Sequence, residues 1–399
     1  MDLEVDREQE NQRVLTLLEA LKKASKDLRC NPISLSNKES ETTVEVLSKL
    51  EAEAATAFST DPKLLNLSRL LCSLKTLLER LEQSQSYSLK SILRRQITKY
   101  KISQVAFTTE AEIQAFLDRE SVQILARTLT ASADEDKKGK VLIELKNRVC
   151  QGFDRDFQDL VLRAKVFSIL ESLLCDSTCS QRLREQAALA VDALVRFNKN
   201  VFVGLVFMGP TIGALISMGS RSSIQVLCSL IRFIRSPLID EMESNRDILR
   251  IVNILRSEDL SIRAAALDCI LELAYFGRVE IITVMLGEDL VRKLMELQRF
   301  ELGTSSVLKK KNGGICVETE SETRVENKES EHIENYPFES CVTRFAVQVE
   351  IGEGSNKIEK TEVKLEILRR VREASVSEAE SATIEMEILW LEIFDGGGR

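Results

Sequence analysis

The chain has 399 residues, a formal net charge of −8 and an isoelectric point near 5.3. Phosphate binding requires Lys and Arg gathered on one surface, so this acidic balance argues against a nucleic-acid partner. Only 5 prolines, 16 glycines and 5% aromatic residues are present, which favours helices over a β-sandwich. The composition therefore predicts an all-α protein.

Nine cysteines are scattered along the chain, and the acidic start MDLEVDREQE lacks the basic and apolar parts of a secretory signal. We therefore expect reduced thiols and a cytoplasmic or nuclear location, or both. Cys175 and Cys179 are the only close pair. With no second pair and no nearby histidine they make a poor zinc signature, and we expect neither a metal nor a cofactor.

Residues 1–135 are expected to form an N-terminal helical bundle. Asp61 followed by Pro62 is typical of a helix start, because the carboxylate accepts backbone N–H groups and proline has none to lose. Thr109 with Glu112 resembles a capping box and predicts the start of a further helix. The helix after Pro62 has leucines alternately three and four residues apart, which indicates a seam facing another helix. These leucines are Leu64, Leu67, Leu71, Leu74, Leu78 and Leu81. Their expected partners within the chain, favoured over an intermolecular seam, are Val14, Leu17, Leu18, Leu21, Leu47, Leu50, Ala54, Leu89, Ile92, Leu93 and Ile97.

Residues 136–302 contain three similar helical stretches. They begin at Arg184 (REQAALAVDALV), Ser223 (SIQVLCSLIRFI) and Arg263 (RAAALDCILELA), so the steps from 184 to 223 and from 223 to 263 are 39 and 40 residues. In each stretch the seventh residue is small and the eighth and eleventh are bulky and apolar. This period is typical of two- or three-helix repeats that stack into an α-α superhelix, a solenoid.

The run from Asn200 to Ser220 has no charged residue and approaches the roughly 20 residues that a membrane-spanning helix requires. Pro210 and four glycines interrupt this run. Gly209 precedes Gly287 by two repeat lengths, and the helix expected after Gly287 is amphipathic. We therefore expect a turn between repeats followed by a buried helix, and no integral membrane span.

The composition changes after residue 302. Residues 303–335 carry alternating charges and few apolar residues, which predicts a flexible charged loop. His332, the only histidine, falls there and is expected at the surface. Residues 336–399 are expected to form C-terminal helices that could close the solenoid. Ser377 with Glu380 predicts a capping box for the last helix, although the segment up to Trp390 also alternates like a strand.

The repeats resemble armadillo repeats. REQAALAVDALV at 184–195 is similar to the third-helix pattern of plant armadillo proteins, and FMGPTIGALISMGS at 207–220 is similar to their glycine turn and next helix. The resemblance extends to the armadillo region of plant U-box ubiquitin ligases and implies a solenoid that binds protein partners. RCNPISL at 29–35 resembles the opening of a U-box, but the inserted Asn31 breaks the match, and we expect no U-box. The Trp and Asn ladder of an importin-α-like receptor is also missing, because the sole Trp is Trp390.

Motifs of catalysis are missing from the sequence. No phosphate-binding loop, GxSxG elbow or HExxH motif occurs, and one histidine cannot supply a His-based triad. We therefore predict a non-enzymatic scaffold or adaptor that binds a protein on its armadillo-like surface. Arg184 and Arg263 open equivalent helices and are the candidate partner-binding residues, although contacts within a repeat would explain them equally well. The alternative is a ubiquitin ligase pathway component without its own U-box, and a third possibility is a peripheral membrane scaffold.

Overall fold

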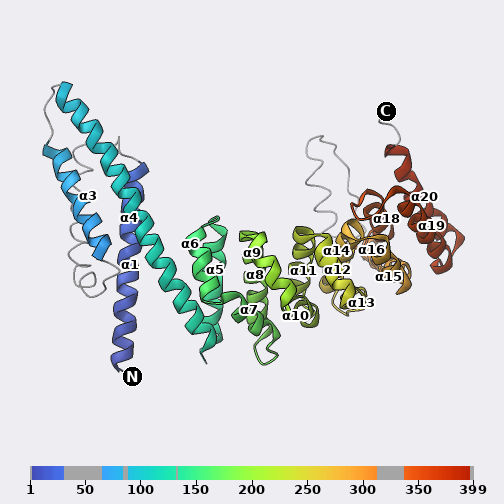
Figure 1. Ribbon diagram of the computed structural model, residues 1–399. Coiled ribbons are helices and arrows are strands. Elements are labelled where there is room, and N and C mark those ends of the chain that lie inside the picture. Colours follow the sequence, from blue (N-terminus) through green and yellow to red (C-terminus); the bar gives the residue numbers. More distant parts are fainter. Residues whose placement is uncertain (1, 31–64, 84–88, 132–133, 312–336, 396–399) are drawn as a thin grey trace. The chain divides into compact units, whose positions relative to one another are not determined.

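Helices account for all regular structure in the part of the chain that the computed structural model describes (Figure 1). There is no strand in these ranges, so the predicted all-α class is confirmed. The described residues are 2–30, 65–83, 89–131, 134–311 and 337–395. Leu47, Leu50, Ala54, the Asp61–Pro62 start, most of the U-box-like segment and His332 lie outside them.

The chain divides into two compact units. Unit 1 contains Met1–Ser132 and Asp154–Val166, and unit 2 contains Ala133–Phe153 and Phe167–Arg399. The division after residue 132 falls close to the predicted end of the N-terminal bundle at 135. Residues 154–166, which we had assigned to the repeats, belong instead to unit 1.

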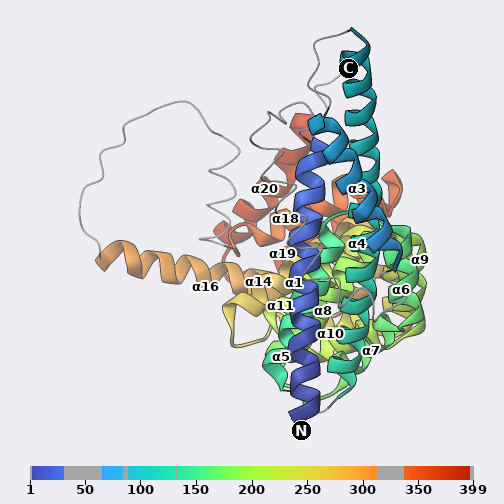
Figure 2. The ribbon, with the colours of Figure 1, turned by 90° about the vertical axis from the view of Figure 1, so that its left-hand side faces the viewer.

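Unit 1 is built around one long helix, α4. Both α1 and α3 pack against α4, and α6 packs on it further along the chain. Figures 1 and 2 both show α1 lying alongside α4. The bounds of these helices are α1 (Asp2–Cys30), α3 (Leu65–Gln83), α4 (Leu89–Thr130) and α6 (Arg155–Arg163).

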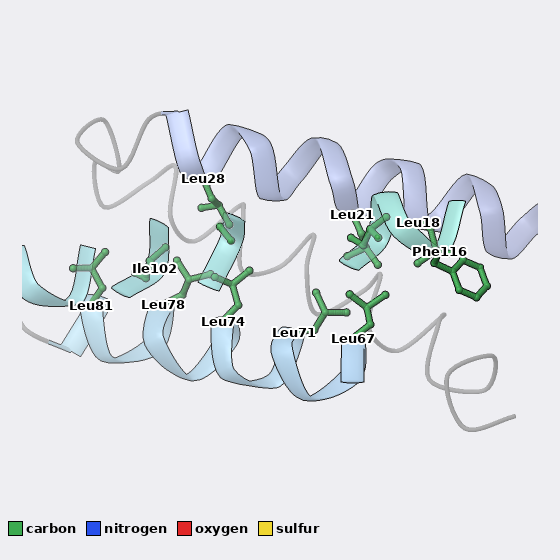
Figure 3. Packing of buried hydrophobic residues seen from close by; sticks show 12 residues of the cluster. Leu18, Leu21, Leu28, Leu67, Leu71, Leu74, Leu78, Leu81, Ile102 and Phe116 are labelled. Atoms are coloured by element: carbon green, nitrogen blue, oxygen red, sulfur yellow. The ribbon is translucent and has the colours of Figure 1, made fainter. Parts of the chain in front are cut away.

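The predicted leucine seam of α3 is confirmed from Leu67 to Leu81, because each of its five leucines in the described residues is at most 5% exposed. Figure 3 shows how the seam meets α1 and α4. One end of the cluster holds Leu18, Leu67 and Phe116, and the other end holds Leu28, Leu81 and Ile102. Helices α1 and α3 therefore run in the same direction, and α4 runs opposite to both.

The predicted helix start at Thr109 is wrong. Thr109 lies inside the continuous helix α4, and its side chain is fully buried. Its hydroxyl donates a hydrogen bond to the carbonyl oxygen of Val105, four residues earlier, at 2.8 Å. A threonine that bonds backward in this way satisfies its polar group within the helix, so no cap is needed.

The expected burial of Ile92, Leu93 and Ile97 is also wrong. These side chains are 50%, 64% and 56% exposed. The face of α4 that packs in unit 1 instead carries Ile102 and Ile113, which are both fully buried. Helix α4 is thus apolar on two sides, and only one of them is covered.

Unit 2 repeats a group of three helices in which two short helices precede a third. The third helices α8, α11, α14 and α18 contact one another in succession, and α5 contacts α8 ahead of them. This arrangement is an α-α solenoid, as the forty-residue period predicts. The helices are α5 (Glu135–Cys150), α7 (Val166–Cys175), α8 (Gln181–Phe197), α9 (Lys199–Met208), α10 (Thr211–Met218), α11 (Arg221–Ile234), α12 (Ser236–Ser244), α13 (Asp247–Ile254), α14 (Leu260–Phe276), α15 (Val279–Gly287), α16 (Leu290–Lys311) and α18 (Cys341–Ile351).

Two differences from the sequence prediction concern the fourth repeat. Helix α16 continues to Lys311, so the expected loop is wrong for residues 303–311, and 312–336 lie outside the described residues. Helix α18, which we had placed with separate C-terminal helices, packs against α14 and α16. It is therefore the third helix of the repeat that begins with α15, although 29 residues (312–340) separate it from α16.

The apolar run of 200–220 forms two helices, α9 and α10, bent by 71° at the break between them. The predicted turn at Gly209 and Pro210 is confirmed, and α10 buries Ile212, Leu215 and Ile216. Among the described residues no single helix is long and apolar enough to cross a membrane, although this bent pair has the necessary combined length and composition.

Two further helices, α19 (Lys357–Ala374) and α20 (Glu378–Asp395), pack on the fourth repeat. The predicted cap of α20 is confirmed in one half: the Glu380 amide donates to Ser377 Oγ at 3.2 Å. The Glu380 carboxylate accepts instead from the Val376 amide and from Arg299 Nε, at 2.9 and 2.6 Å. Arg299 thereby ties α16 to α20, and it holds the pKa of Glu380 below its ordinary value.

We expect Leu74→Ala to lower the free energy of unfolding by about 2–5 kcal/mol, because it leaves a cavity between helices that cannot fully close. Leu74 is fully buried, whereas the neighbouring Ser73 is exposed. Urea unfolding followed by circular dichroism measures the change, and Ser73→Ala is the control, with an expected change within about 0.5 kcal/mol. Equal effects of the two substitutions would contradict the described packing of α3.

Candidate functional site

The third helices of three repeats begin at equivalent capping residues. Side chains of Ser180, Ser220 and Asp259 each accept a backbone N–H at the start of α8, α11 and α14. From 180 to 220 and from 220 to 259 the steps are 40 and 39 residues. This corrects the register read from the sequence by one residue in the middle repeat: Arg184 and Arg263 remain equivalent, but the buried Ile224 stands between them in place of Ser223.

The corrected register shows that equivalent side chains of these helices stay out of the core. Burial recurs at the same places in all three helices, and in the middle of each helix three shared positions remain exposed or half-buried. We name these nine residues the repeat stripe: Glu185, Leu189 and Asp192 on α8, Gln225, Ser229 and Arg232 on α11, and Ala264, Asp268 and Leu271 on α14. Because α8, α11 and α14 contact one another in order, the stripe forms a continuous surface.

Polar side chains of the stripe link α8 to α11. Ser229 Oγ donates to Asp192 Oδ1 at 2.5 Å, and Arg196 Nη2 donates to Ser229 Oγ at 2.6 Å. Arg196 Nε also donates to Asp192 Oδ2 at 3.0 Å. The sequence pattern had placed Ser229 among the small core residues, but its hydroxyl lies in this network at the surface.

The next two helix pairs are linked by ion pairs. Arg232 donates to Glu272 Oε1 from Nε and Nη2 at 2.9 and 2.5 Å, joining α11 to α14. This carboxylate raises the pKa of Arg232 above its ordinary value. Between α14 and α18, Arg344 Nη2 lies 3.9 Å from Asp268 Oδ1. Surface pairs of this kind contribute little to stability, so their main effect is to orient the charged groups.

The stripe carries an excess of negative charge. Its nine residues include three carboxylates, on Glu185, Asp192 and Asp268, and one guanidinium, on Arg232. Within the described part of the chain Glu185 forms no ion pair, and it accepts a hydrogen bond from Gln181 Nε2 of its own helix at 3.2 Å. A surface of this charge attracts a basic partner and repels phosphate groups.

The α14 end of the stripe combines a crowded carboxylate with apolar surface. Desolvation by its neighbours raises the pKa of Asp268 above its ordinary value, and Arg344 and Arg232 oppose this shift. Leu271 on α14 and Leu189 on α8 are half-buried, so each leaves part of an apolar side chain uncovered. The stripe can therefore accept both a cation and an apolar side chain from a partner.

Arg184, the first of the predicted partner-binding residues, makes a contact within its own repeat. Its Nε donates to the carbonyl oxygen of Leu174 at 3.0 Å, in the last turn of α7. A cation at this position favours the helix, because the last carbonyl groups lack donors of their own. Arg184 also lines a cleft of about 500 Å³ with Pro210 and Arg250.

Arg263, the second predicted residue, has a different environment. Its guanidinium lies over the ring of Phe300, 5.3 Å from the centroid, and its buried Nε has no hydrogen-bond partner. Phe300 belongs to α16, so this contact joins two repeats. The structure does not bring Arg184 and Arg263 together, because α11 lies between the helices that carry them. Their role in partner binding stays a prediction.

Beside the cleft, the carboxylate of Glu171 packs directly against the backbone at Gly209. A Cβ atom at residue 209 would come within 1.8 Å of Glu171 Oε1, which explains the need for glycine there. Thr211 Oγ1 donates to the same oxygen at 2.7 Å. Burial raises the pKa of Glu171 above its ordinary value, and the Thr211 bond opposes the shift.

Groups suited to catalysis or metal binding do not cluster in the described residues. No set of three or more His, Cys, Asp and Glu side chains there could hold a metal ion. Cys179 Sγ donates to Asp176 Oδ2 at 3.4 Å. Burial raises the pKa of both Cys175 and Cys179, which keeps the thiols protonated and poorly suited as ligands.

Comparisons with known proteins give structural likeness alone. No protein-family model and no curated protein sequence matches the chain. Among solved structures, an engineered protein aligns with a TM-score of 0.44 at 12% identity, over 70% of this chain and 98% of its own. A designed armadillo repeat protein aligns with a TM-score of 0.41 at 15% identity, over 68% and 99%. Another, titled as a complex with the peptide (KR)4, gives 0.41 at 17% identity, over 68% and 98%. The solenoid is defined here by its own helix contacts, and these likenesses carry none of the argument.

Gly209→Ala should lower the free energy of unfolding by about 1–3 kcal/mol, because the new methyl group forces Glu171 out of place. The backbone at Gly209 has φ −111°, which alanine adopts freely, so the effect is steric alone. Gly204→Ala is the matched control: nothing lies within 4 Å of its added Cβ, and alanine in helix α9 should stabilise by about 0.5–1 kcal/mol. Thermal unfolding of both variants checks this, and a neutral Gly209→Ala would contradict it.

Glu171→Gln should raise the melting temperature at neutral pH. The pKa of Glu171 is higher in the folded than in the unfolded chain, so the carboxylate costs stability above this pKa and the cost vanishes as the group protonates. The difference between variant and wild type should therefore shrink as pH falls toward 4. Melting curves from pH 4 to 8 test this, and a gap that widened in acid would have the wrong sign.

Proposed function

We propose that the chain is a non-enzymatic protein-interaction scaffold whose partner lies along the repeat stripe. The observation that supports this is the recurrence of equivalent exposed or half-buried positions on three successive third helices that contact one another. A solenoid of this kind spends most of its apolar side chains on stacking and leaves an extended surface for a partner. The resemblance of the repeats to armadillo repeats points to the same role.

The chemistry of the stripe favours a partner segment that combines Lys or Arg with apolar side chains. Three of the charged residues in the stripe are acidic and one is basic, and the half-buried Leu189 and Leu271 offer apolar contacts. The bond of Glu185 with Gln181 lies within α8, so a partner cation can bind Glu185 without displacing a bond between helices. We further propose a cytoplasmic or nuclear location, where such thiol-rich chains remain reduced.

Reversing charge on the stripe tests the proposal. Partners are first identified by proximity labelling with the full chain in cells and then purified. Glu185→Lys with Asp268→Lys should weaken binding of such a partner at least about tenfold, since two attractions become repulsions in a partly desolvated interface. The matched control reverses two exposed acids off the stripe, Glu258→Lys with Glu280→Lys.

The two double variants carry the same net charge, so a difference between them reports the position of the charges and not their sum. Melting temperatures close to that of the wild type show that both variants remain folded. Equal losses of binding in the two variants, or none in the first, would contradict the proposal.

The ubiquitin-pathway alternative stays a prediction from the sequence. It rests on the resemblance to plant U-box proteins, and most of the U-box-like segment lies outside the described residues. Autoubiquitination by the purified chain with a conjugating enzyme would overturn the prediction that the chain lacks its own U-box. Ubiquitination of a captured partner only when a separate ligase is added would support the alternative.

A further inference from the structure

Helix α4 of unit 1 presents a row of large apolar side chains to solvent. Leu93, Ile97, Tyr100 and Phe107 are 64%, 56%, 65% and 57% exposed. Single exposed apolar residues are ordinary on protein surfaces, but a contiguous row marks an interaction site. This row is distinct from the repeat stripe, which belongs to unit 2.

The spacing of the row is that of a coiled-coil seam. With Gln104 included, its members stand at 93, 97, 100, 104 and 107, so steps of four and three residues alternate. Gln104 Nε2 donates to the hydroxyl of Tyr100 at 3.0 Å within the row. We name these five residues the outer seam. At 100° per residue it falls on the side of α4 opposite to Ile102 and Ala106, which are buried against the bundle.

The flank of the outer seam is basic. Arg94 follows Leu93 and Lys101 follows Tyr100, so the two exposed cations occupy the same heptad position, seven residues apart. From 89 to 109 the helix contains five Lys and Arg residues and no Asp or Glu. Residues beside a coiled-coil seam select the partner by their charge, and this flank selects a carboxylate-bearing partner.

We propose that the outer seam of α4 pairs with an acidic amphipathic helix of another protein, as a two-stranded coiled coil. The seam spans about two heptads, or roughly 22 Å of helix. Because α1 and α3 already hold α4 folded, only the partner helix loses conformational freedom on binding. Carboxylates on the partner pair with Arg94 and Lys101 while its apolar residues cover Leu93, Ile97 and Tyr100.

Charge argues against a second copy of this chain as the occupant. An antiparallel pair of α4 helices would place Arg94 and Lys101 against their own kind, and a parallel pair would place them opposite the neutral Gln96 and Ser103. The narrow seam argues against a membrane surface. A helix that lies in a lipid interface carries a broad apolar face with cations along both edges, whereas the three cations Lys90, Arg94 and Lys101 follow one edge of the outer seam.

Binding of two matched synthetic peptides to the full-length protein tests the proposal. Both peptides have four heptads with Ile and Leu in the seam; one carries Glu and the other Lys at the flanking positions. We expect the Glu peptide to bind with a micromolar Kd by fluorescence anisotropy and the Lys peptide to bind at least about tenfold more weakly. Arg94→Glu with Lys101→Glu should reverse this preference. Arg127→Glu, an exposed charge reversal on α4 outside the outer seam, should leave it unchanged.

Three results would overturn the proposal: failure of the Glu peptide to bind, binding that survives the reversal at 94 and 101, or self-association of the chain that Leu93→Ser with Ile97→Ser abolishes. Flotation with anionic phosphatidylserine vesicles is measured in parallel. Vesicle binding that the same Leu93 and Ile97 substitutions remove, without binding of the Glu peptide, would assign the outer seam to a membrane instead. Because the exposed Leu93 and Ile97 contribute little to the bundle core, an unchanged melting temperature shows that these variants remain folded.

Discussion

Burial between successive third helices is the interaction on which unit 2 depends. Helix α11 shows why: eight of its 14 residues are buried, including Leu227, Leu230 and Ile231. One helix of this length is marginal by itself in water, and the short helices that precede it bury too little surface to hold it. Contacts with α8 on one side and α14 on the other supply the missing burial, so each repeat is stable only as part of the stack.

This constraint also determines what remains for function. Side chains that face the neighbouring helices must be apolar or small, so only positions turned away from the core are open to polar and charged residues. Those positions form the repeat stripe, and its polar groups bond across the helix boundaries through Ser229 with Asp192 and through Arg232 with Glu272. The bonds hold the charges in set positions, which lowers the entropic cost of binding a partner there.

Much of the fold could be predicted from the sequence because its signals are local. The leucine seam of α3 lies within one helix, and the turn at Gly209 and Pro210 breaks one apolar run. The prediction failed where a residue has two possible uses. Thr109 could cap a helix or bond backward inside one, and only the buried, continuous α4 decides between them. Similarly, apolar residues on both sides of α4 show that two faces exist but not which face the bundle covers.

The candidate site was harder to predict because it depends on register between repeats. Ser229 is small, as a core position requires, and only the capping residues Ser180 and Ser220 show that it stands one place away from the core position filled by Ala190. Helix α18 could not be assigned to its repeat for a related reason: 29 residues (312–340) separate it from α16. Its membership follows from contact with α14, a long-range feature that local periodicity does not contain.

Amide hydrogen exchange of the full chain, compared with a Leu273→Ala variant, tests most directly whether the third helices stabilise one another. Leu273 is a fully buried residue of α14. If each helix depends on its neighbours, exchange should become faster in α11 and α18 as well as in α14, while unit 1 keeps its wild-type rates. Faster exchange confined to α14, with α11 and α18 unchanged, would contradict the account.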